Sequence, residues 1–201
     1  MVKKSTFIIF FLFFLAVPLL THADAGVPMI AFTFPAMIVA FIPIVFIEAI
    51  VYSFSLKIKY KNAIFPSFIS NLKSTLVGIP VTWAYLLLVQ LLGALLMTLF
   101  ANVFPKIPAL HRAFTLLAQI AWFLPFEENQ YNWMVPTAAA IGLIPTYFIS
   151  IKIEFEAIKK YFKDVDEFRL KQVVKKANTV TYIILFIYIP VSLYILFIHF
   201  W

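Results

Sequence analysis

Long apolar stretches, each interrupted by proline, alternate along the chain with shorter segments that are rich in lysine. A helix needs about 20 mostly apolar residues to cross the hydrocarbon core of a bilayer. The pattern predicts four membrane-spanning helices, over residues 29–54, 76–103, 133–153 and 180–200. A fifth apolar segment, residues 113–126, is too short to cross, and we interpret it as an interfacial or re-entrant segment.

The N-terminus has the pattern of a signal peptide. Two lysines precede an apolar run over residues 7–20, and small residues follow at the positions that a signal peptidase reads. We predict a signal peptide over residues 1–25, cleaved after Ala25, with Ala23 as the second choice and an uncleaved anchor as the alternative. The remaining residues, 26–201, are predicted to form a single all-α polytopic membrane domain.

Basic residues predict the orientation, because cytoplasmic loops of membrane proteins are enriched in lysine and arginine. The segments that follow the first and third spans hold twelve of them: Lys57, Lys59, Lys61, Lys73, Lys152, Lys159, Lys160, Lys163, Arg169, Lys171, Lys175 and Lys176. The segment between the second and third spans holds only Lys106 and Arg112. The asymmetry predicts a bacterial inner-membrane protein whose mature N-terminus and C-terminus both lie outside.

The segment between the third and fourth spans has helical periodicity. Phe155, Ile158, Phe162 and Val165 recur at spacings of three and four, with charged residues between them. We predict a cytoplasmic amphipathic helix over residues 154–177, which lies on the inner leaflet or packs against a partner. The alternative is a solvated extension of the third span.

Composition supports a membrane environment. Hydrophobic residues make up 64% of the 201 positions and charged residues only 12%, whereas soluble domains carry about 25% charged residues. The net charge of +7 is explained by topology, and no basic patch with stacking aromatics indicates nucleic-acid binding. The chain has no cysteine, no glycine-rich phosphate loop and no nucleophile motif. We therefore predict no cofactor.

Proline recurs within the predicted spans. Each proline removes a backbone donor and frees a carbonyl one turn earlier, so Pro43, Pro80, Pro145 and Pro190 are predicted helix kinks. Transporters use such broken helices around polar cavities, although proline is also common in membrane helices generally.

Glu48 is the one acidic residue within a predicted span. A carboxylate in lipid must be paired, protonated or exposed to water. Its candidate partners are Lys73, Asn71 and Ser74, and Asn71, Ser74 and Gly78 share one helical face that would suit a contact with the first span. The predicted role is a polar contact that fixes packing. A proton or ion site and a snorkelling side chain are the alternatives.

Three residues of the predicted outer loop are metal-ligand types: His111, Glu127 and Glu128. Their spacing matches no metal motif. We predict no metal site and retain the three only as weak candidates.

Part of the chain resembles a known family. The residues that carry the resemblance are Glu48-Ala49, Asn71-Leu72, Ser74-Thr75, Gly78 and Trp83. This stretch, residues 48–83, resembles part of the cyanobacterial filament-integrity membrane proteins of septal junctions. The resemblance implies a non-enzymatic membrane subunit of a cell-envelope assembly.

Three functions follow as hypotheses. The first is a non-enzymatic interaction or assembly subunit, whose partners are the lipid bilayer and other membrane proteins or further copies of itself. The second is a small proton- or ion-coupled transporter or channel that uses Glu48. The third is a membrane-embedded enzyme acting on lipid, which requires Glu127, Glu128 and His111 to converge.

Overall fold

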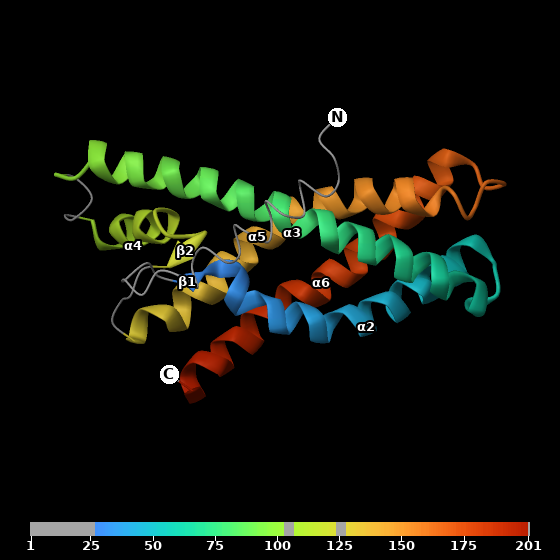
Figure 1. Ribbon diagram of the computed structural model, residues 1–201, viewed down its shortest axis with the longest axis horizontal. Coiled ribbons are helices and arrows are strands. Elements are labelled where there is room, and N and C mark those ends of the chain that lie inside the picture. Colours follow the sequence, from blue (N-terminus) through green and yellow to red (C-terminus); the bar gives the residue numbers. More distant parts are fainter. Residues whose placement is uncertain (1–26, 103–106, 124–127, 201) are drawn as a thin grey trace, which may run out of the picture.

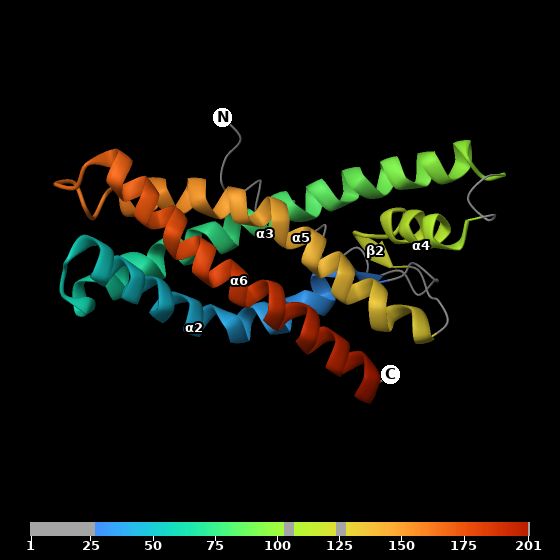
Figure 2. The ribbon, with the colours of Figure 1, turned by 180° about the vertical axis from the view of Figure 1, so that it is seen from behind.

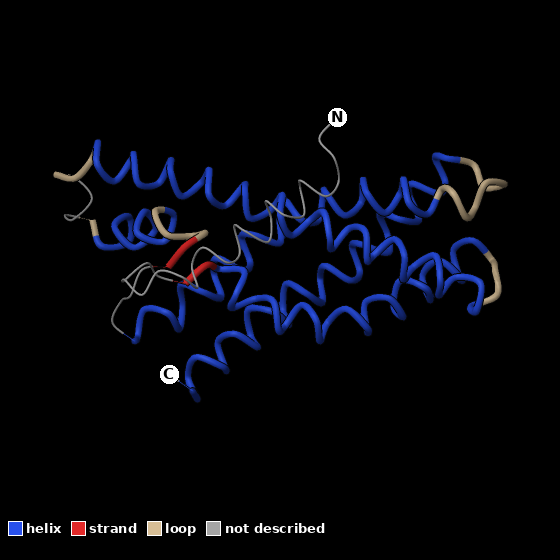
Figure 3. Tube along the Cα trace, in the orientation of Figure 1, coloured by secondary structure: helices blue, strands red, loops and turns tan. Residues whose placement is uncertain are grey.

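The computed structural model describes residues 27–102, 107–123 and 128–200. Its helices are α2 (Met29–Leu56), α3 (Tyr60–Leu99), α4 (Pro108–Leu117), α5 (Glu128–Ile158) and α6 (Glu167–Phe200), and its short strands are β1 (Val27–Pro28) and β2 (Trp122–Phe123). Helix dominates the trace (Figure 3), as the sequence predicts. The predicted signal peptide, residues 1–25, lies outside the described residues.

Four of the helices, α2, α3, α5 and α6, are long and apolar enough to cross a membrane. The shortest, α2, has 28 residues and is about 42 Å long at a rise of about 1.5 Å per residue. The hydrocarbon core of a bilayer is about 30 Å thick. The prediction of a multi-pass membrane protein with four candidate spans is confirmed.

The helices extend well beyond the predicted spans. α3 begins at Tyr60, 16 residues before the predicted start at residue 76, and α6 begins at Glu167, 13 residues before residue 180. Hydropathy marks only the apolar part of a helix. The polar early turns of α3 and α6 stay helical because their small and apolar residues, such as Ala63 and Val174, are buried between helices.

The predicted amphipathic helix over residues 154–177 is wrong as a continuous element. α5 ends at Ile158 and α6 begins at Glu167, with turns and loop between them. Asp166 ends the loop, because its Oδ2 accepts a hydrogen bond from the backbone N–H of Arg169 at 2.9 Å and so caps the start of α6. The apolar side chains do pack inward, but from two helices and a loop.

The prolines lie inside continuous helices. Pro43 is within α2, Pro80 within α3, Pro145 within α5 and Pro190 within α6. The helices continue on both sides of each proline, and the predicted kinks stay a prediction.

The four long helices form an elongated bundle of two hairpins. α2 and α3 make the first hairpin and α5 and α6 the second, and both hairpin loops lie at the same end of the molecule (Figures 1 and 2). α2 packs on α3 and α6, and α5 packs on the same two helices. The bundle is therefore a ring, in which α2 and α5 lie mainly across its centre from each other.

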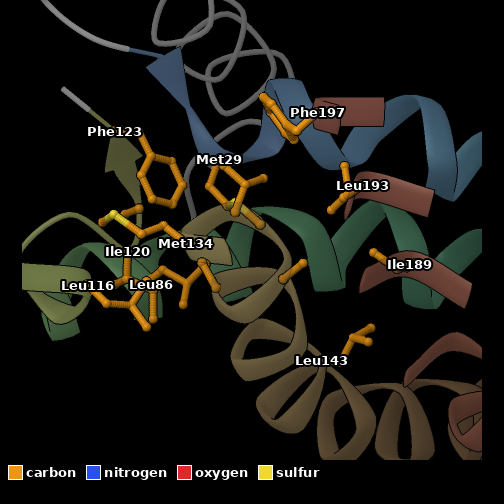
Figure 4. Packing of buried hydrophobic residues seen from close by; sticks show 14 of the residues in the cluster. Met29, Leu86, Leu116, Ile120, Phe123, Met134, Leu143, Ile189, Leu193 and Phe197 are labelled. Atoms are coloured by element: carbon orange, nitrogen blue, oxygen red, sulfur yellow. The ribbon is translucent and has the colours of Figure 1, made fainter. Parts of the chain in front are cut away.

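The other end of the bundle is closed by the short elements. β1 pairs antiparallel with β2, with Val27 opposite Phe123. Gln90 of α3 supports the connection, because its Oε1 accepts hydrogen bonds from the backbone N–H groups of Ala121 and Trp122 at 3.0 and 2.9 Å. Met29, Phe123, Met134 and Phe197 all belong to the larger apolar cluster at this end (Figure 4).

The described part of the segment predicted as interfacial or re-entrant, residues 113–123, is structured. α4 and the turn after it pack on α3 and bury Leu116, Ile120 and Phe123. Gly93 makes this approach possible, because a Cβ at that position would lie 2.6 Å from the carbonyl carbon of Leu117. Where this segment sits relative to the bilayer stays a prediction.

A second, smaller apolar cluster closes the end with the hairpin loops. It contains Ala49, Tyr52, Ala63, Ile158, Leu170, Val173, Val174 and Ala177. The interior between the two clusters is polar, and the candidate site lies there.

Candidate functional site

Two carboxyl groups meet between the two apolar clusters. Glu48 comes from α2 and Glu154 from α5, on opposite sides of the ring, and each residue is only 1% exposed. The two carboxyl groups line the same cavity, and each accepts hydrogen bonds from neighbouring turns of α3 and α6. Glu48 lies eight residues before the end of α2, which places it about 12 Å inside the loop end of the bundle.

The Glu48 carboxyl accepts hydrogen bonds from three helices. Asn71 Nδ2 of α3 donates to Oε2 at 2.6 Å, and Thr181 Oγ1 of α6 donates to Oε1 at 3.0 Å. The Tyr52 hydroxyl, one turn further along α2, lies 3.5 Å from Oε2. Both neighbouring helices of the ring therefore support this carboxyl.

The Glu154 carboxyl is held in the same way. Ser74 Oγ of α3 donates to Oε1 at 2.8 Å, and Asn178 Nδ2 of α6 donates to Oε2 at 2.7 Å. The other end of the Asn178 amide is different. Its Oδ1 is buried and has no hydrogen-bond partner among the described residues.

The structure brings together only part of the contact that the sequence predicts. Asn71 does contact Glu48, but Ser74 contacts Glu154. Gly78 faces α5, where its nearest side-chain atom is Thr146 Cγ2, 3.6 Å from an ideal Cβ. The polar stripe of α3 faces the groove between α2 and α5, so its residues divide between those two helices.

Lys73, the other predicted partner of Glu48, is exposed on the outside of the bundle. The one ion pair among the described side chains joins Lys159 and Glu167 near the loop after α5. Among the described residues, therefore, no lysine or arginine forms an ion pair with Glu48 or Glu154.

The arrangement favours a proton or another cation, because two buried carboxylates without a cationic partner among the described residues are costly to keep ionised. Two unit charges about 4 Å apart would repel by about 4 kcal/mol at an effective dielectric constant of about 20. The pair is thus suited to exchange protons or cations rather than to remain doubly ionised.

The two hydroxyls around the pair have alternative acceptors. Ser74 Oγ lies 3.0 Å from the carbonyl of Asn71 as well as 2.8 Å from Glu154. Thr181 Oγ1 lies 3.2 Å from the carbonyl of Ala177 as well as 3.0 Å from Glu48. A hydroxyl has one proton. Each can donate it to an ionised carboxylate or turn it to the backbone and accept from a protonated carboxyl.

The site is built twice from one pattern, once in each hairpin. Its residues correspond at separations of 106 or 107 positions: Glu48 with Glu154, Asn71 with Asn178, and Ser74 with Thr181. Each asparagine donates to the glutamate of its own hairpin. Each hydroxyl donates to the glutamate of the other hairpin.

The burial pattern of the second helices repeats at the same separation. Residues 63, 66, 67, 70, 71, 74 and 78 of α3 are buried, and so are residues 170, 173, 174, 177, 178, 181 and 185 of α6. The two helices also begin 107 residues apart, at Tyr60 and Glu167. Because both loops lie at one end (Figure 1), the two hairpins are parallel repeats about an axis along the bundle.

A cavity of about 130 Å³ leads to the pair from the strand end. One face of α2 lines it, with Met29, Thr33, Met37, Ala40, Ile44 and Glu48. The opposite face comes from α5, with Ala138, Gly142, Thr146, Ser150 and Glu154. Both series recur at helical spacing, so the cavity follows the bundle axis and has the two carboxyl groups at its inner end.

The weak metal candidates do not form a site in the described structure. His111 lies on α4, and Glu127 is outside the described residues. No group of three or more His, Cys, Asp or Glu residues in the described part of the chain could hold a metal ion. The enzymatic hypothesis, which depends on these residues, stays a prediction.

No protein-family model, curated protein or solved structure matches the chain. The resemblance of residues 48–83 to septal-junction proteins therefore stays a prediction.

Proposed function

We propose that this protein is a small, non-enzymatic proton-coupled carrier in which the Glu48–Glu154 pair is the proton site. The observation that carries the proposal is the position of the two carboxyl groups, both buried and both at the inner end of an axial cavity. Ionisable residues inside membrane bundles commonly mark proton relays and solute pathways. The hydroxyls of Ser74 and Thr181, each with two acceptors, serve both protonation states.

The internal repeat supports the same proposal. Many secondary transporters are built from repeats, and their solute and ion sites lie at the interface between the repeats. Here each hydroxyl crosses from one hairpin to the carboxyl of the other. A change of protonation therefore alters contacts between the hairpins, which are the two bodies that would move in such a mechanism.

We further propose that the protein lies in a bacterial inner membrane, with the two hairpin loops in the cytoplasm. The twelve basic residues of the loops and of the helix ends next to them support this orientation. The carboxyl pair then lies toward the cytoplasmic side, and the cavity extends from it toward the outer side.

Infrared pH-difference spectroscopy of the purified protein tests the proton site. The expected spectrum contains a band from a buried protonated carboxyl that is lost in Glu48→Gln and in Glu154→Gln. Glu156→Gln is the matched control, because Glu156 lies two residues along the same helix and is exposed. A spectrum without such a band, or a band that both substitutions leave in place, would overturn the proposal.

Proteoliposomes with an imposed proton gradient and an internal pH dye then test coupling. A solute that dissipates the gradient through the wild-type protein should fail to do so through Glu48→Gln, and Glu156→Gln should behave as wild type. Equal dissipation in Glu48→Gln would contradict a role for the pair in coupling.

An assembly subunit is the second candidate, favoured by the distal half of α3. This part of α3 has a continuous apolar surface that reaches past its main contacts with the other long helices. The surface is formed by five leucines, each 54–70% exposed: Leu88, Leu91, Leu92, Leu95 and Leu99. Because the chain has no native cysteine, any crosslink formed by a variant with one introduced cysteine comes from that position. Leu95→Cys should crosslink in cells to a partner or a second copy, whereas Ile187→Cys on α6 should not. Equal crosslinking would indicate lipid contact only.

A further inference from the structure

We propose that the cavity binds a lipophilic primary ammonium compound, with its ammonium group at the Glu48–Glu154 pair and its apolar body in the cavity. This proposal deepens the proposed carrier function and rests on it, because it names the class of solute that the proton site would exchange.

The walls of the cavity select an apolar body. Beyond the carboxyl pair they are formed mainly by aliphatic and aromatic side chains, among them Met37, Ile44, Ile79, Leu86, Leu143 and Ile189. Figure 4 shows Leu143 and Ile189 on facing helices. Polar groups are few along these walls, and two of them, Thr82 and Thr146, are hydrogen-bonded to each other. A sugar or a nucleotide would lose its hydration without gaining enough partners.

The volume limits the size of that body. An apolar cavity of about 150 Å³ holds one benzene molecule, and the cavity here measures about 130 Å³. A compound with one ring or a short branched chain therefore fits, and a long-chain lipid does not. The probe of matching size is benzylamine.

The inner end of the cavity selects a positive charge. Glu48 and Glu154 both line it, and no cationic side chain of the described structure pairs with them. An ammonium group has three donors and no acceptor, so it meets this surplus of acceptors.

An aromatic ring near the pair adds to the preference for a cation. Tyr182 lines the cavity next to Thr181, which contacts Glu48, and its hydroxyl lies 2.8 Å from Ser150 Oγ. Phe41 and Trp83 line the cavity further toward the strand end. Ring faces attract ammonium groups, most strongly where water is excluded. A neutral alcohol of the same shape gains little from these rings.

Charge balance makes the binding an exchange. A pair that carries two protons is neutral, and a pair that carries one proton and one ammonium is also neutral. We infer that the empty pair carries two protons, so that one H⁺ leaves to solvent for each ammonium that enters, and no covalent bond of the solute changes. Benzylamine should therefore bind more tightly as the pH rises, up to the pH at which the amine itself loses its proton.

Few other titratable groups contribute to this exchange. Tyr52 of α2 faces Glu48 and Tyr182 of α6 faces the cavity, and both are neutral donors. The lysines of the packed helices at this level, Lys73 of α3, Lys152 of α5 and Lys175 of α6, are exposed on the outer surface.

Calorimetric titration of the full chain in nanodiscs tests the proposal with benzylamine and its neutral isostere, benzyl alcohol. We expect benzylamine to bind about tenfold more tightly, as a modest net ionic contribution of about 1.4 kcal/mol would give. Titrations in buffers of different ionisation enthalpy should show release of a proton. The preference should vanish in Glu48→Gln and Glu154→Gln and persist in Glu156→Gln.

A second variant tests the cavity independently of the two carboxyl groups, and binding of benzyl alcohol by the glutamine variants shows that they are folded. Ala139→Leu places a larger side chain in the cavity wall and should weaken benzylamine and benzyl alcohol together. Equal affinity of the wild-type protein for the two compounds would overturn the proposal. A preference that survives both glutamine substitutions, or no binding of either compound, would do the same.

The failure of this inference is separable from failure of the carrier proposal. If benzylamine shows no preference but the infrared band of the pair is present and lost in the glutamine variants, the solute class is wrong and the proton site stands. If the band is absent, the proton-coupled function fails, whatever binds in the cavity.

Discussion

Replacement of Asn71 by leucine tests which residue stabilises the Glu48 carboxyl. The observed partner is Asn71, whereas charge alone would suggest Lys73. Leucine keeps a similar volume but removes the 2.6 Å hydrogen bond to Oε2. Hydrogen bonds to charged groups contribute about 1.5–3 kcal/mol in soluble proteins, but double-mutant cycles between membrane helices average about 0.6 and reach about 1.7 kcal/mol. The Asn71–Glu48 bond is short, buried and made to a carboxyl group, so we expect a coupling near the upper end, about 1.5 kcal/mol.

The assay is equilibrium unfolding in mixed micelles for wild type, Asn71→Leu, Glu48→Met and the double variant. The coupling of about 1.5 kcal/mol corresponds to about a tenfold departure from additivity in the unfolding equilibrium. Lys73→Met is the control, because Lys73 is two residues away on the same helix but exposed. Its cycle with Glu48→Met should be additive.

Two results would refute this reasoning. A coupling between Asn71 and Glu48 below about 0.5 kcal/mol would lie within the ordinary error of additivity and would mean that the hydrogen bond does not hold the carboxyl. A larger coupling with Lys73 would restore the ion pair that the sequence suggests. The repeat adds a check, since Asn178→Leu and Glu154→Met should couple to a similar degree.

Two further predictions concern the framework of the site. Gly93→Val should loosen α4 and destabilise the protein by about 1–3 kcal/mol through overpacking, because the new Cβ would meet the backbone of Leu117 at 2.6 Å, while Gly78→Ala, with its nearest neighbour at 3.6 Å, should cost nothing measurable in the same unfolding assay. Reporter fusions after Lys61 and after Lys163 should report one compartment and a fusion after Asn102 the other, because the two hairpin loops lie at one end of the bundle and α3 ends at the opposite one; different compartments for Lys61 and Lys163 would contradict the bundle topology.

The fold was largely predictable because hydrophobicity dictates the four spans. Helix boundaries were not, because the polar early turns of α3 and α6 are buried by neighbouring helices rather than by lipid. The periodicity of Phe155, Ile158 and Phe162 did indicate inward-facing positions. It could not reveal that the chain turns between Ile158 and Glu167, since a capped loop can present the same apolar residues to the same core.

The candidate site was half visible in the sequence. Glu48 stood out because apolar residues surround it, whereas Glu154 lies among charged residues and reads as part of a solvated surface. The missed signal was the recurrence of glutamate, asparagine and a hydroxyl residue at a separation of 106 or 107 residues. Asn178 and Thr181 follow from it directly, as the counterparts of Asn71 and Ser74.

The division of contacts between the hairpins would connect the proposed proton site to movement. The hydrogen bonds from Asn71 to Glu48 and from Asn178 to Glu154 lie within a hairpin. A glutamate that gains a proton keeps a carbonyl oxygen that can still accept the hydrogen bond from its asparagine. The bonds of Ser74 to Glu154 and of Thr181 to Glu48 lie between hairpins, and these hydroxyls have backbone acceptors to turn to. Protonation of the glutamates would thus weaken the hydrogen bonds between the two hairpins or reverse their direction, while the hydrogen bonds within each hairpin remain. Because binding free energies are reciprocal, a solute that displaces a proton in the cavity must shift the same interface, and this is the coupling that a carrier requires.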